Sequence, residues 1–157
     1  MMTSYSVVSG TWEHAEALAP VMREADTQEV WATSHSTPLE ALERSLVVSR
    51  DTRAGLVDGR VVCMFGVGAG TALSLSGYPW LLASDELVRH AVRFLRESLS
   101  YVTWAMTVWT RLENFVDTRN SAALRWLRWL GFSLRHAAPF GIDRRPFHYF
   151  YMERQHV

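Results

Sequence analysis

The chain has 157 residues, of which 48% are apolar, and its sixteen basic residues, all arginine, balance sixteen acidic ones. This length predicts one domain over residues 1–157, with a core large enough for independent folding. The zero formal net charge argues against a nucleic-acid-binding protein, because such proteins carry an excess of basic residues.

Three features bear on the compartment. Cys63 is the single cysteine and lies in an apolar run, so it cannot form an internal disulfide and is expected in the core. The stretch between Arg60 and Asp85 has no charged residue, but its glycines and its proline favour two buried strands over a membrane span. No secretory signal opens the sequence. A cytoplasmic protein is therefore expected.

The N-terminal third predicts one strand and two helices. Residues 4–9 are read as a strand, and Thr11 is placed to cap a helix that Pro20 kinks or divides. A polar loop is predicted next. At Thr37, a threonine cap, a proline at the first helical position and Glu40 at the third predict a second helix.

The middle of the chain predicts a hairpin. Residues 53–57 and 60–67 are apolar enough for strands and flank Asp58-Gly59, a dipeptide that favours a tight turn. The glycine-rich residues 66–70 are interpreted as a bulge or a flexible connection rather than as a phosphate-binding loop.

A strand at 79–83 and a helix at 85–100, capped by Ser84, are predicted next. The apolar positions of this helix predict its packing face: Val88, Ala91, Val92, Leu95 and Leu99. Its arginines are interpreted as a solvated face, with nucleic-acid binding as a distant alternative: Arg89, Arg93 and Arg96.

The last third predicts a strand at 112–116, a helix at 121–130 and strands at 132–137 and 147–152. Gly131 is expected to end the helix in a left-handed conformation. The whole order predicts an α/β (α+β) domain. We expect a mixed, mostly antiparallel sheet of about six to seven strands, flanked by about four helices.

One spaced set of residues resembles the GNAT (N-acetyltransferase) superfamily. Val116 precedes Asn120 by four residues, Ala123 follows it by three, and Gly131-Phe132 closes the helix. In physical terms Asn120 is a helix cap, and Gly131 reverses the chain. The resemblance implies a GNAT-like fold and acetyl-CoA as a possible cofactor.

A narrower resemblance covers the second half of the chain, at residues 79–87, 94–98, 112–120 and 125–132. These segments are similar to small acetyltransferase-like proteins encoded among the virion genes of podovirus-type tailed phages. That group is associated with assembly of the internal virion core, so the resemblance implies a phage or prophage protein with virion proteins as partners.

The cofactor site implied by the resemblance departs from the GNAT pattern. A glycine-rich diphosphate cradle normally follows the strand at 79–83, but here the sequence reads Ser84-Asp85-Glu86, and two carboxylates repel a diphosphate. Weak or absent acetyl-CoA binding is therefore expected. If the cofactor binds, the resemblance places five residues beside it: Leu82, Ala83, Ser84, Leu87 and Asn120.

The catalytic residues are left unassigned. Leu127 stands where many GNAT enzymes have a proton-donating tyrosine. Candidate bases are Asp117, Glu113 and His136, of which Asp117 is more typical of a helix cap and His136 of a strand histidine with a hydrogen-bond partner. No metal-binding spacing occurs. The sequence thus favours a GNAT-fold protein with a degenerate acetyl-CoA site that acts through protein contacts in virion assembly. The alternative is an active acetyl-CoA-dependent N-acetyltransferase acting on a primary amine.

Overall fold

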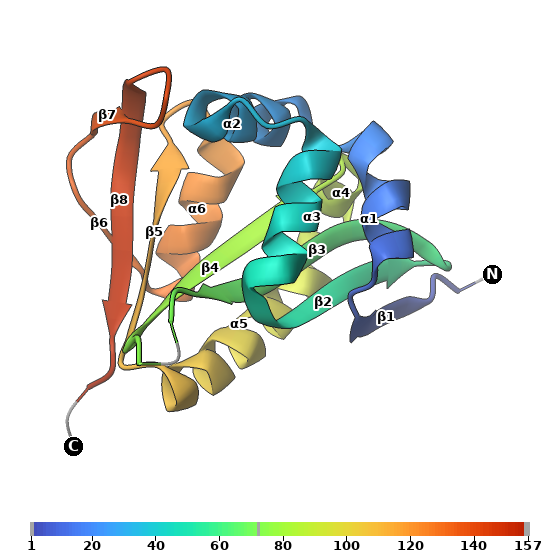
Figure 1. Cartoon of the computed structure of the whole chain (residues 1–157). Helices are drawn as coiled ribbons and strands as arrows, with labels where there is room; N and C mark the ends of the chain where they lie inside the picture. Colours follow the sequence, from blue (N-terminus) through green and yellow to red (C-terminus); the bar gives the residue numbers. More distant parts are fainter. Residues whose placement is uncertain (1, 72, 156–157) are drawn as a thin grey trace.

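A computed structural model describes residues 2–71 and 73–155 and shows a central sheet covered by helices (Figure 1). Eight strands within these residues lie in the order β1-β2-β3-β4-β5-β8-β6, and β7 pairs with β8. All neighbours are antiparallel except β4 and β5. The strands are β1 (Tyr5–Ser9), β2 (Ser49–Val57), β3 (Arg60–Ala69), β4 (Ser76–Ala83), β5 (Arg111–Asp117), β6 (Ser133–Leu134), β7 (Ala138–Phe140) and β8 (Arg145–Glu153).

Helices form a layer on each face of the sheet. On one face Leu18 and Leu42 of the N-terminal helices pack with Met64 of β3, and on the other Phe94 packs with Phe65. The described residues form six α-helices and one short 3-10 segment, Ala19–Val21. The helices are α1 (Trp12–Leu18), α2 (Glu24–Ser34), α3 (Pro38–Val48), α4 (Glu86–Arg89), α5 (Ala91–Val108) and α6 (Ser121–Leu130).

The predicted helix starts and turns are confirmed where the signal is local. The Thr11 and Thr37 hydroxyls each accept a bond from the backbone N–H three residues later, at 3.3 Å. Asp58 and Gly59 adopt φ values of 49° and 81°, as the β2–β3 turn requires, and Gly131 ends α6 at φ 98°. The first helix stops before Pro20, which lies in the 3-10 segment.

Several predictions are wrong in detail. The segment predicted as a polar loop contains α2, and the sheet has one to two more strands than expected. The helix predicted at 85–100 is divided at His90 and extends to Val108. The strand predicted at 132–137 shrinks to β6, while the glycines of 66–70 largely lie within β3, where Gly66 allows close approach of the Trp80 ring.

Two of the features that bear on the compartment can be compared with the structure: Cys63 and the uncharged stretch before Asp85. Cys63 is buried in the core as expected, and burial raises the pKa of its thiol to about 12. Within the described part of the chain, no helix is both long and apolar enough to cross a membrane.

Candidate functional site: a cavity where the sheet splits

The parallel strands β4 and β5 separate soon after they meet. Their register holds only at Ser76 opposite Arg111 and Gly77 opposite Leu112. Two residues later comes Pro79, which has no N–H to donate across the strand pair. Its carbonyl instead accepts a bond of 3.0 Å from the Asn114 side chain on β5. The proline therefore helps to open the sheet at this point.

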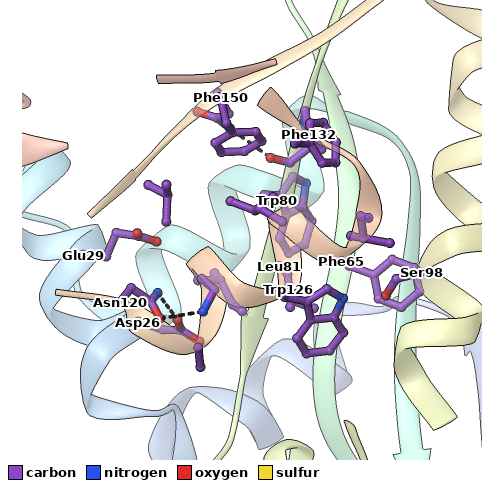
Figure 2. A pocket seen from close by; sticks show the side chains of 18 of the residues that line it. Asp26, Glu29, Phe65, Trp80, Leu81, Ser98, Asn120, Trp126, Phe132 and Phe150 are labelled. Carbon is purple, nitrogen blue, oxygen red and sulfur yellow. Dashed lines mark hydrogen bonds between the residues drawn. The ribbon is translucent and has the colours of Figure 1, made fainter. Parts of the chain in front are cut away.

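A cavity of about 670 Å³ lies between the separated strands and is lined by residues from both faces of the sheet. Its wall includes Val30 of α2 and Ala41 of α3 on one face, and Leu95 of α5 and Trp126 of α6 on the other. Figure 2 shows Trp126 and Phe65 on one side of Leu81 and the carboxylates of α2 on the other. The volume is within the range of small-molecule sites.

One end of the cavity is closed by a buried polar cluster around Asp26. Asp26 is 3% exposed, and its Oδ2 accepts a 3.0 Å bond from the backbone N–H of Ala83 at the end of β4. Its Oδ1 accepts bonds from Asn120 Nδ2 at 3.0 Å and from Arg23 Nη1 at 3.2 Å. Burial raises the pKa of Asp26, while Arg23 and the hydrogen bonds oppose that rise. The cluster ties α2 to β4 and α6 (Figure 2).

Glu29 lies one turn further along α2 and also lines the cavity. Its carboxylate accepts a 2.7 Å bond from the backbone N–H of Asp117. Burial, reinforced by the nearby charges of Asp26 and Asp117, raises the pKa of Glu29 to about 8. Glu29 is therefore a carboxyl group that can hold or release a proton near neutral pH.

The three candidate bases named from the sequence are engaged or distant. Burial alone would raise the pKa of Asp117, but the side chain and backbone of Arg119 hydrogen-bond to the carboxylate and lower it. Glu113 accepts a bond from Ser76 and pairs with Arg111 at 2.9 Å. His136 is exposed in the segment between β6 and β7. Glu29, a carboxyl group on the cavity wall, is the better candidate for a general base, and the sequence analysis did not identify it.

The segment after β4 offers few free donors. The Ser84 N–H bonds to the Val62 carbonyl at 2.9 Å, and the Leu87 N–H bonds back to Ser84 at 3.2 Å. The helix that follows, α4, has four residues, so its dipole is small. The carboxylate of Glu86 pairs with Arg60 at 2.5 Å, and Asp85 is exposed.

On the α5–α6 side the cavity opens between two helices with apolar surfaces. Val88 is 56% exposed and Trp129 is 54% exposed, and both line the cavity. Three residues of the predicted packing face are exposed and not packed: Val88, Val92 and Leu99. Val88, Ala91 and Leu95 of that face line the cavity. Leu127, at the position where many GNAT enzymes have a tyrosine, also lines the cavity.

Structures of acetyltransferases superpose on almost the whole chain. An acetyltransferase of the GNAT family from Streptococcus pneumoniae is 14% identical, with a TM-score of 0.65 over 97% of this chain and 100% of that one. A putative acetyltransferase from Acinetobacter baylyi is 13% identical, with a TM-score of 0.71 over 98% and 94%. The chain has the GNAT fold.

A third GNAT-like structure was solved with acetyl-CoA. This putative acetyltransferase from Salmonella typhimurium is 10% identical, with a TM-score of 0.66 over 98% of this chain and 96% of that one. Comparison with protein-family models and with curated proteins found no match. The TM-scores establish the GNAT fold, whereas identities this low say nothing of the chemistry, which has to be argued from the site itself.

The predicted cofactor residues separate into two groups. Leu82, Leu87 and Asn120 line the cavity. The backbone N–H groups of Ala83 and Ser84 bond within the protein, to Asp26 and to Val62. Their roles toward a cofactor stay predictions.

The residues at this place do not fit the diphosphate of coenzyme A. Asp85 and Glu86 bring negative charge to the start of α4, and the N–H groups of Ser84 and Leu87 already have partners. No glycine brings the backbone closer. Within residues 2–71 and 73–155, no group of acidic, cysteine and histidine side chains is arranged to hold a metal ion.

Proposed function

We propose that this GNAT-fold protein acts through protein contacts and not through efficient acetyl transfer from acetyl-CoA. The observation that carries this proposal is the segment after β4, where Asp85 and Glu86 stand in place of a diphosphate cradle. A diphosphate in this position would meet carboxylates and few unbonded N–H groups, so its binding would be opposed by charge and unsupported by hydrogen bonds.

The opening between α5 and α6 is the contact surface in this proposal. Exposed apolar side chains of Val88 on α4 and Trp129 on α6 flank it, and the exposed Asp85 directly precedes α4. These features favour an amphipathic helix with an apolar stripe and a basic residue at the end near Asp85. Tryptophans are frequent anchors of such interfaces.

The resemblance to virion-gene proteins of tailed phages supports a partner among the virion proteins of the same genome. In that setting the protein would act in the host cytoplasm during assembly of the virion core. Pull-down with each virion protein tests this. Trp129→Ala is expected to reduce retention of the partner, whereas Trp12→Ala changes a tryptophan that is 50% exposed on α1 and should not. Equal retention by both variants, or failure of wild type to retain any virion protein, contradicts the proposal.

A thermal shift experiment with acetyl-CoA tests the first half of the proposal. A ligand at about one hundred times its dissociation constant adds about 2.7 kcal/mol to stability. We expect millimolar acetyl-CoA to leave the melting temperature unchanged. A clear upward shift, absent with sodium sulfate at the same ionic strength, would refute the proposal.

Glu29 supports a second candidate function, acetyl transfer to a primary amine. Its pKa of about 8 and its place on the cavity wall suit a general base that deprotonates an ammonium group. A screen of primary amines with acetyl-CoA at mildly alkaline pH tests this candidate. Transfer by wild type that is lost in Glu29→Gln supports it, and no transfer to any amine removes it.

A further inference from the structure

The edge of β4 that faces the opening presents backbone groups from every second residue. Pro79, Leu81 and Ala83 share this orientation, since strand residues alternate and since the bonds of Pro79 and Ala83 point away from β3. The Pro79 carbonyl bonds to Asn114. Leu81 lies beyond the last β4–β5 pair and lines the cavity.

Both backbone groups of Ala83 are bonded by the segment around α2. Its N–H donates to Asp26 Oδ2 at 3.0 Å, and its carbonyl accepts a 2.8 Å bond from the Arg23 N–H. A side-chain carboxylate thus lies where a neighbouring strand or an extended ligand would place its own acceptor. Because Asn120 and Arg23 bind the other carboxylate oxygen, Asp26 is held in this position from two directions.

We infer that Asp26 is an internal ligand of the β4 edge that closes it to extended, amide-bearing chains such as the pantetheine arm of coenzyme A. An extended chain adds to a strand edge by pairing with successive outward residues. With Ala83 bonded to Asp26 and Arg23, Leu81 is left as a single pairing point. This inference rests on the proposed function and adds to it a second barrier to cofactor binding, separate from the carboxylates after β4.

S-acetylpantetheine is the probe that separates the two barriers, because it has the amides of the cofactor arm and no phosphate for Asp85 or Glu86 to repel. Titration calorimetry would compare wild type with Asp26→Ala, which frees the Ala83 N–H. Arg23→Ala is the matched control, since it also breaks a side-chain bond to Asp26 but leaves the bond between Asp26 and Ala83 in place. We expect affinity to rise about two- to ten-fold in Asp26→Ala alone, as one regained backbone hydrogen bond permits.

Wild-type affinity equal to that of a folded Asp26→Ala, or an equal gain in Arg23→Ala, would overturn the inference. Hydrogen exchange at the Ala83 amide of wild type provides a test without a variant. Slow exchange is expected from a buried bond to Asp26, and exchange as fast as in exposed strand edges would also overturn it. If wild type binds acetyl-CoA, the proposed function fails. If wild type and Asp26→Ala both fail to bind S-acetylpantetheine, only the Asp26 inference fails.

Discussion

Asn120→Ala changes a side chain that is 1% exposed and that joins the start of α6 to α2 and to Arg23 directly before α2. Asn120 Oδ1 accepts the Ala123 N–H at 3.4 Å, which caps α6, and Nδ2 donates to Asp26 at 3.0 Å. Arg23 also reaches Oδ1, at 3.5 Å. Alanine removes these bonds and leaves the Asp26 carboxylate with fewer donors in a buried site.

The expected loss of stability follows from two contributions. A lost N-cap costs about 1 kcal/mol. A lost buried hydrogen bond to a charged group costs about 1.5–3 kcal/mol. Together they predict that the free energy of unfolding falls by about 2.5–4 kcal/mol. In a domain of this size each kcal/mol lowers the melting temperature by about 2–4 °C, so a decrease of about 5–15 °C is expected.

Urea unfolding of wild type and Asn120→Ala at neutral pH, followed by tryptophan fluorescence, measures this loss. Asn120→Ser separates the contributions, because serine can cap the helix but is too short to reach Asp26, and about 1 kcal/mol should be recovered. A double-mutant cycle with Asp26→Ala should give a coupling energy of about 1 kcal/mol or more. A loss below about 0.5 kcal/mol for Asn120→Ala, or full additivity with Asp26→Ala, would refute the reasoning.

Two further predictions test other parts of the structure. Burial raises the pKa of Glu29 from its ordinary 4.5 to about 8, so the folded protein keeps a proton that the unfolded chain releases. Stability should therefore fall as pH rises from 4.5 to about 8, and Glu29→Gln, which still accepts the Asp117 N–H, should reduce this fall in urea titrations; an unchanged pH profile contradicts this. Gly141→Ala should destabilise more than Gly59→Ala in thermal unfolding. Both glycines have positive φ, at 79° and 81°, but a Cβ at Gly141 would lie 2.7 Å from the Ala32 carbonyl oxygen, whereas the space at Gly59 is open. We expect about 1 kcal/mol for Gly59 and at least about 1 kcal/mol more for Gly141, and equal losses contradict the steric argument.

The features that were predicted correctly each depend on a few residues that are close together in the sequence. Thr37 and Glu40 cap each other across one turn, and both backbone bonds are present. Gly131 ends a helix because glycine has no Cβ to hinder a positive φ. Asn120 was predicted as a helix cap for the same kind of local reason, and its side chain accepts the Ala123 N–H.

The main error in the fold was α2, read as a polar loop. Its buried residues are Asp26 and Ala32, one charged and one apolar. No continuous apolar stripe therefore marks the helix in the sequence. The carboxylates of Asp26 and Glu29 are spaced three residues apart, which fits one helix face, and this spacing was the signal available. On α5 the apolar positions do not all pack in the core, since Val92 is exposed and Leu95 lines the cavity.

The sequence by itself determined the helix caps, the β2–β3 turn and the absence of glycines directly after β4, because each depends on residues close together in the chain. Only the tertiary structure decided that Asp26 meets Ala83, 57 residues away, and Asn120, 94 residues away. Such pairings depend on where the split sheet and α2 bring backbone and side-chain groups together, which local spacing does not encode. The negative charge of Asp85 and Glu86 could be predicted from the sequence, whereas the hydrogen bond of Asp26 to the edge of β4 could be seen only in the tertiary structure.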